Sequence, residues 1–174
     1  KKRSFRHPVK NLLILFGGTD PNNYSMHTID AILDMCKEKN IFIYCVTGPG
    51  YLYKEELELY LRKIGYDLIN YTHKTGVVSS IMEKVDLAIA SAGRTVYELA
   101  HMHIPAIIMA QNKREELHAF ARPENGFEYI GYMNPFNYNK LIEKFKKMLD
   151  MEYRRLLFDR MKRFHFELNK PLLV

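Results

Sequence analysis

The run from Ser91 to Glu98 brings small, cationic, hydroxyl and acidic residues together directly after an apolar stretch. Gly93 has no side chain to keep a ligand from the backbone, and the free N–H groups at a helix start attract phosphate. Arg94 and Thr95 add a charged donor and a hydroxyl group. Glu98 lies one helical turn further, where a carboxylate can accept both hydroxyls of a ribose. These residue types predict a half-site for phosphate and ribose.

The same residues also have a purely structural explanation. Ser91 or Thr95 can cap a helix, and the spacing from Thr95 to Glu98 is that of a capping box. Spacing alone leaves both explanations open.

A second junction of this kind is Gly17-Gly18-Thr19-Asp20-Pro21. Paired glycines after an apolar run make a tight turn in which the backbone can meet a ligand. Asp20 and Pro21 are also a natural N-cap and first residue of a helix. Both roles can hold together.

The third junction is dense in polar groups and runs from Gln111 to His118. Asn112 can cap a helix here while Gln111, Arg114, Glu115 and His118 face a ligand. A solvated helix start is the alternative, and residue types alone favour it.

A fourth junction extends from Tyr71 to Val77 and contains His73 and a flexible Gly76. An aromatic side chain beside exposed backbone can hold a planar base, and this junction is the least specific of the four. The sequence offers no convincing catalytic triad, acid/base carboxylate pair or metal-ligand spacing. We therefore expect no metal and no cofactor.

The elements that position these junctions alternate between short apolar runs and longer segments of helical period, which indicates an α/β fold. The apolar runs are nearly continuous, as in parallel strands covered on both faces. Ligands of such sheets bind beyond the carboxyl ends of the strands, where all four junctions fall. Strands are predicted over residues 11–16, 41–46, 67–71, 86–90, 106–109 and 128–130. Helices are predicted over residues 24–39, 51–64, 77–83, 94–102, 113–121, 137–149 and 152–167. The fold class is a Rossmann-like three-layer sandwich with a parallel sheet of about six strands.

Composition limits the class of protein. The chain has 174 residues, of which 47% are hydrophobic, so it fits one globular domain and is neither disordered nor fibrous. Its longest apolar runs fall far short of the roughly 20 residues that span a bilayer, so we expect no membrane span. Two cysteines form no disulfide framework, which fits a cytoplasmic protein. We divide the chain into a linker from an upstream region (1–9), the Rossmann-like domain (10–150) and a C-terminal helix and tail (151–174).

The net charge of +6 arises from 26 Lys and Arg against 20 Asp and Glu, and the basic residues crowd the two ends. This balance favours anionic ligands in general. Basic and aromatic residues mix near the C-terminus, as in some nucleic-acid binders. We rank that alternative below a solvated amphipathic helix, so nucleic acid is not the expected partner.

Several of these motifs together resemble the C-terminal half of GT-B sugar-nucleotide enzymes. The run VDLAIASAGRTVYELA (85–100) carries the resemblance, with Ile-Pro-Ala (104–106), Gln-Asn-Lys-Arg-Glu (111–115) and Asn-Gly-Phe (125–127). It is similar in particular to the UDP-sugar hydrolase family of pseudaminic acid biosynthesis and its spore-coat polysaccharide relatives, whose entry into this half matches residues 15–21. More distantly, it resembles the N-acetylglucosaminyltransferase that makes lipid II. The pattern Asn-x-Arg-Glu followed by His also resembles domains fused to sialic-acid-type cytidylyltransferases.

The resemblance implies a UDP-sugar as ligand and an upstream domain of the same polypeptide as partner. That other half would supply the general acid/base histidine, so this chain alone would bind without turnover. The implied site residues are Gly93, Arg94 and Thr95 with Ser91 for the pyrophosphate, Glu98 for the ribose, Gly17, Gly18 and Thr19 at the border of the cleft, His73 and Val77 for uracil, and Asn112, Glu115 and His118 near the sugar.

The expected function is the nucleotide-sugar-binding half of a UDP-sugar hydrolase of surface-polysaccharide or nonulosonic acid biosynthesis. One alternative is a glycosyltransferase half. Another is a non-catalytic nucleotide-sugar-binding module fused to a cytidylyltransferase. The sugar stays open, because this chain has Glu115 and Glu116 where the resembled hydrolases carry Gln in a neighbouring position.

Overall fold

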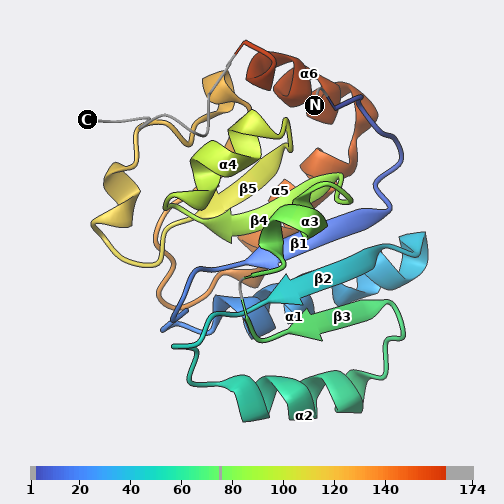
Figure 1. Cartoon of the computed structure of the whole chain (residues 1–174), viewed down its shortest axis with the longest axis vertical. Helices are drawn as coiled ribbons and strands as arrows, with labels where there is room; N and C mark the ends of the chain where they lie inside the picture. Colours follow the sequence, from blue (N-terminus) through green and yellow to red (C-terminus); the bar gives the residue numbers. More distant parts are fainter. Residues whose placement is uncertain (1–2, 75, 164–174) are drawn as a thin grey trace.

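The computed structural model describes residues 3–74 and 76–163, which build a six-stranded parallel sheet in the order β3-β2-β1-β4-β5-β6 (Figure 1). From β1 the chain moves outward through β2 and β3, then crosses back to β4 beside β1 and continues to β6. The carboxyl ends of β1 and β4 therefore meet where the strand order reverses. The strands are β1 (Asn11–Leu15), β2 (Phe42–Val46), β3 (Ile69–Thr72), β4 (Leu87–Ser91), β5 (Ala106–Met109) and β6 (Phe127–Ile130).

Helices cover both faces of this sheet. One face packs against α1 (Tyr24–Lys39), α2 (Lys54–Ile64) and α5 (Tyr138–Leu149). The other face packs against α3 (Val78–Met82) and α4 (Thr95–His101). A last helix, α6 (Met151–Met161), contributes side chains to both layers. The predicted three-layer Rossmann-like sandwich is confirmed.

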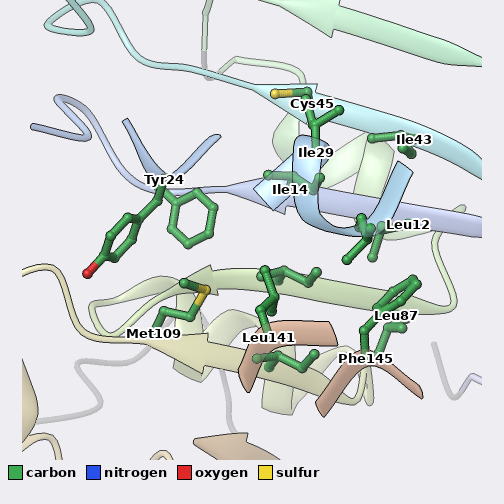
Figure 2. Packing of buried hydrophobic residues seen from close by; sticks show 14 of the residues in the cluster. Leu12, Ile14, Tyr24, Ile29, Ile43, Cys45, Leu87, Met109, Leu141 and Phe145 are labelled. Atoms are coloured by element: carbon green, nitrogen blue, oxygen red, sulfur yellow. The ribbon is translucent and has the colours of Figure 1, made fainter. Parts of the chain in front are cut away.

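Alternation along the strands explains why the central strands β1, β4 and β5 are almost entirely apolar. In β1, Leu12 and Ile14 point into the layer of α1 and α5, whereas Leu13 and Leu15 point into the layer of α3 and α4. Figure 2 shows the first of these layers, with Ile29 of α1 and other buried side chains around the strand residues. A strand buried on both faces has no polar side to present, so period-2 patterning disappears.

The predicted helix over residues 113–121 is wrong. This segment forms a 3-10 turn, η1 (Glu115–Leu117), and a second one, η2 (Pro123–Asn125), follows before β6. Asn112 Oδ1 accepts the N–H of Glu115 at 2.8 Å, and the Glu115 carboxylate accepts the N–H of Gln111 at 2.9 Å. Such local side-chain bonds offer the backbone an alternative to a helix. The last predicted helix ends at Met161, and residues 164–167 of that prediction lie outside the described residues.

The segment that enters β1 is fixed to α6 through Arg154. This side chain is 1% exposed and donates to the carbonyl oxygens of Met148, Leu149 and Arg6. Burial lowers the pKa of its guanidinium group. The carboxylate of Asp86, just before β4, accepts two backbone N–H groups at the start of β1. Residues 3–9 thus pack on α6 and on the β4 entrance.

Candidate functional site at the β1–β4 switch point

The loops that follow β1 and β4 meet at the point where strand order reverses, which is the usual ligand position in open α/β sheets. Gly17 has φ +77°, a backbone conformation that glycine adopts without strain. A Cβ at this position would lie 3.7 Å from Ser91 Oγ. The structure thus brings the predicted loop of Gly17, Gly18 and Thr19 against Ser91. We call residues 91–95, for which phosphate contacts are predicted, the phosphate loop.

The phosphate loop offers open space and unused backbone donors. Ser91 and Ala92 are buried, but a Cβ on Gly93 would meet no atom within 4 Å. Within residues 3–74 and 76–163, the N–H groups of Arg94 and Thr95 have no hydrogen-bond acceptor. This arrangement can receive an anion on Gly93.

The capping alternative for these residues is wrong. Helix α4 begins at Thr95 with Arg94 as N-cap, and no side chain caps it. Among the residues that the structure describes, none hydrogen bonds to the Glu98 carboxylate, and desolvation raises its pKa. Arg94 is exposed and has no ion pair in the same part of the chain. Both charged groups are therefore available to a ligand.

The loop after β1 is held by Asp20, though not in the predicted way. Its carboxylate is buried and accepts the N–H groups of Tyr24 and Ser25, both at 2.8 Å. Helix α1 begins at Tyr24 with Asn23 as N-cap, so the expectation of Asp20 as N-cap and Pro21 as first helical residue is wrong. A turn closed by the Asn23 N–H and the Asp20 carbonyl lets the carboxylate reach the helix start from further upstream. Desolvation raises the pKa of Asp20, and the bonded N–H groups oppose that rise.

The loop after β2 supports the β1 loop from the other side, which the sequence analysis did not foresee. A Cβ on Gly48 would lie 2.6 Å from Gly18 Cα, and a Cβ on Gly50 would lie 2.9 Å from Thr19 Cγ2. The Tyr51 hydroxyl donates to Asn23 Oδ1. The signal was two glycines around a proline directly after a predicted strand, the same kind of junction as the others.

The loop after β5 joins its neighbours through buried polar groups. Gln111 Nε2 donates to the Phe16 carbonyl oxygen at 2.6 Å, so its amide is directed into the β1 loop rather than toward a ligand. The Glu115 carboxylate contacts the backbone N–H groups of Gln111 and Ala92, which lower its pKa against a larger rise from desolvation. Asn112 is occupied by its bond to Glu115. Contact of Asn112 and Glu115 with a sugar stays a prediction.

The predicted base residues lie at the ends of the strands on the far side of β1. His73 Nδ1 lies 2.8 Å from Thr47 Oγ1, and the Tyr71 hydroxyl lies 2.6 Å from the same atom. Val77 is half-buried and is the N-cap of α3. The imidazole is thus fixed at this edge of the sheet, and its contact with uracil stays a prediction.

A hollow lined by His7, Lys39 and Asp150, among others, lies at the opposite edge of the sheet, where the strands begin. None of the predicted site residues lines it.

No group of three His, Cys, Asp or Glu side chains in the described ranges 3–74 and 76–163 is arranged to hold a metal ion. No helix in these ranges is long and apolar enough to cross a membrane.

Comparison with known proteins gives the family. Residues 12–170 match the model of the glycosyltransferase family 28 C-terminal domain. An uncharacterized protein of Methanocaldococcus jannaschii, MJ1062, is 32% identical over 112 residues, which are 64% of this chain and 23% of that protein. The chain thus spans about a quarter of this relative's length.

Solved structures share the fold at low sequence identity. The C-terminal domain of the glycosyl transferase group 1 family protein LpcC from Francisella tularensis is similar with a TM-score of 0.70 and 15% identity, covering 90% of this chain and 84% of that one. MnaA of S. aureus, solved with UDP, is similar with a TM-score of 0.62 and 18% identity, covering 89% and 39%. The family match, supported by these likenesses in fold, shows that the chain belongs to the glycosyltransferase family 28 C-terminal domains, with the fold of the C-terminal half of GT-B enzymes.

Proposed function

We propose that this chain is the nucleotide-sugar-binding half of a UDP-sugar hydrolase of surface-polysaccharide or nonulosonic acid biosynthesis. The observation that carries the proposal is the free carboxylate of Glu98 in the first turn of α4, the helix that follows the open backbone of Gly93, in a chain of this family. Among the described residues, the Glu98 carboxylate has no hydrogen-bond or ion-pair partner that would occupy it in place of a ligand.

Each group has a role in this proposal. The pyrophosphate lies on Gly93 and accepts hydrogen bonds from the N–H groups of Arg94 and Thr95, with the Arg94 guanidinium as counter-charge. Ser91 lies beneath the loop, where its hydroxyl faces Gly17. Glu98 accepts the ribose hydroxyls. Loss of the hydrogen bonds between Glu98 and the ribose hydroxyls would cost about 1–3 kcal/mol of binding free energy.

The remaining ligand parts follow from this placement. Gly18 and Thr19 border the ligand on the β1 side, and His73 with Val77 holds the uracil. The sugar extends toward the loop after β5. The relative from S. aureus was solved with UDP, which supports a uridine nucleotide as the ligand class.

The chemistry that this half can supply is stabilisation of a leaving group. When water attacks the anomeric carbon of a UDP-sugar, the bond to the pyrophosphate breaks and negative charge grows on UDP. Donors fixed at Gly93 to Thr95 meet that charge without reorganisation, and one such donor is worth about 10²–10³ in rate in other enzymes. The proton of the attacking water must go to a general base, which we assign to the other half of the enzyme. This chain alone therefore binds nucleotide without turnover.

Calorimetric titration of the chain with UDP tests the ligand class, with UMP and CMP as a control pair that differs only in the base. We expect saturable binding of UDP and weaker binding of CMP than of UMP. No binding of UDP to the folded chain would overturn the proposal. For the reaction, the full-length protein is given a UDP-sugar without any acceptor. Release of UDP and free sugar supports hydrolysis, whereas release that requires an added acceptor indicates a glycosyltransferase.

A further inference from the structure

His118 lies beside the phosphate loop in a position that its packing alone does not explain. It follows η1 in the loop after β5, and its ring lies 5.6 Å from the Tyr97 ring of α4, centroid to centroid. The side chain is half-buried. Its Nδ1 atom is buried and has no hydrogen-bond partner among the described residues. The ring also reaches the backbone of Gly93, the residue over which the open space lies.

We propose that His118 is a further anion-binding residue of this site, which takes up a proton when the pyrophosphate of a nucleotide-sugar binds at Gly93. This inference rests on the proposed function. The imidazolium would donate one N–H to the pyrophosphate and would complete a ring of donors with Arg94 and the two free backbone N–H groups.

The surroundings of His118 favour its neutral form while the site has no anion. Burial lowers the pKa of the imidazole, and the nearby Arg122 guanidinium lowers it further. The Gly93 backbone favours the protonated form, but by less than burial opposes it. Tyr97 meets the ring face, and the carboxylate of Glu115 in the same loop is directed to backbone N–H groups. A dianion at Gly93 would be the missing group that favours the charged imidazole.

The sign of the pH dependence follows. The pKa of His118 is below its ordinary value in the free protein and rises when the anion binds. Between these two values, binding takes up a proton, so affinity increases as pH falls toward the pKa of the free protein. Each unit by which the two values differ is worth a factor of about ten in affinity at low pH.

The experiment is a calorimetric titration of the chain with UDP-N-acetylglucosamine at about pH 6 and about pH 8, the range in which histidine titrates. This probe has a pyrophosphate diester, which does not itself titrate there. The titration is repeated in two buffers of different ionisation enthalpy, and the difference in observed binding enthalpy gives the number of protons taken up. We expect uptake near pH 7 and binding about fivefold tighter at the lower pH. His118→Gln and His118→Phe should both abolish the uptake, and the phenyl ring keeps an aromatic contact with Tyr97.

His101→Gln is the matched control, since His101 lies in the last turn of α4, away from Gly93, and this variant should keep the uptake. Binding without proton uptake, or the same uptake in both His118 variants, would overturn this inference and leave the proposed function standing. No binding of the probe at either pH would overturn both. An NMR titration of the His118 ring with and without the probe measures directly whether the pKa of His118 rises when the probe binds.

Discussion

Replacing Gly48 by alanine would place a Cβ 2.6 Å from Gly18 Cα and 2.8 Å from the Gly18 carbonyl oxygen. Both neighbours are backbone atoms, so no side chain can rotate away and the loop itself must shift. Overpacking of this kind costs about 1–3 kcal/mol of folding free energy. For a domain of this size, a loss of 1 kcal/mol lowers the melting temperature by about 2–4 °C. We therefore expect Gly48→Ala to lower it by roughly 2–12 °C.

The matched control is Gly18→Ala, on the other side of the same contact. A Cβ on Gly18 would meet nothing within 4 Å, and its backbone is not in the left-handed region. Alanine there should leave stability unchanged or raise it by up to about 1 kcal/mol, because it restricts the unfolded chain. Thermal unfolding followed by circular dichroism gives the melting temperatures of both variants, and urea unfolding gives their free energies of unfolding. Circular dichroism is the signal because the chain has no tryptophan.

Two results would refute this reasoning. One is wild-type stability in Gly48→Ala, which would mean that the β2 loop moves freely away from the β1 loop. The other is an equal loss in Gly18→Ala, which would mean that any side chain in this region is harmful. Either would remove the support that we assign to the β1 loop.

Three further predictions concern separate parts of the molecule. Glu128 is buried in β6, where desolvation raises its pKa but the bonds from Lys144 and Tyr153 hold it below the usual value overall. The stability that this depressed pKa supplies is present above the unfolded value, about 4.3, and is lost as pH falls through the folded value. Glu128→Gln should therefore cost about 1–3 kcal/mol at neutral pH in urea unfolding and should flatten the acid dependence; an unchanged acid dependence would contradict this assignment. Arg154→Met should also cost about 1–3 kcal/mol and should speed hydrogen exchange of residues 3–9, because carbonyl oxygens lose a buried donor; unchanged exchange there would show that the contact does not fix the segment. Gly93→Ala should change stability by less than about 0.5 kcal/mol, since the added Cβ would meet no atom within 4 Å, yet weaken UDP binding at least tenfold; equal UDP affinity would place the anion elsewhere.

The fold class could be predicted from the sequence because strands buried on both faces are nearly continuous runs of apolar residues. The central strands β1, β4 and β5 are almost entirely apolar, and α1 has the ends that its apolar spacing predicts, Tyr24 and Lys39. The grouping of site residues was also predictable. Carboxyl ends of parallel strands lie at one edge, so Gly17 and Ser91 had to come close once their strands were neighbours.

What the sequence did not reveal depends on contacts between loops. Glu115 is bound by backbone N–H groups of two different loops, and this turns a predicted helix into a 3-10 turn. Gly48 and Gly50 around a proline indicate a junction after β2, but the contacts of Gly48 and Tyr51 with the β1 loop appear only in the folded structure. Such partners are distant in sequence, so residue types and spacing at one junction cannot identify them.

The central claim is that a uridine nucleotide binds at the β1–β4 switch point. Amide NMR spectra of the chain with increasing UDP test it directly, with Glu98→Gln as the site variant. Glu38→Gln, an exposed carboxylate near the C-terminal end of α1, is the matched control. The account predicts the largest shifts at the amides of residues 93–95 and 17–18, loss of saturation in the Glu98 variant and none in the control. Shifts centred instead on the hollow beside Lys39, at the opposite edge of the sheet, or equal binding by both variants, would contradict it.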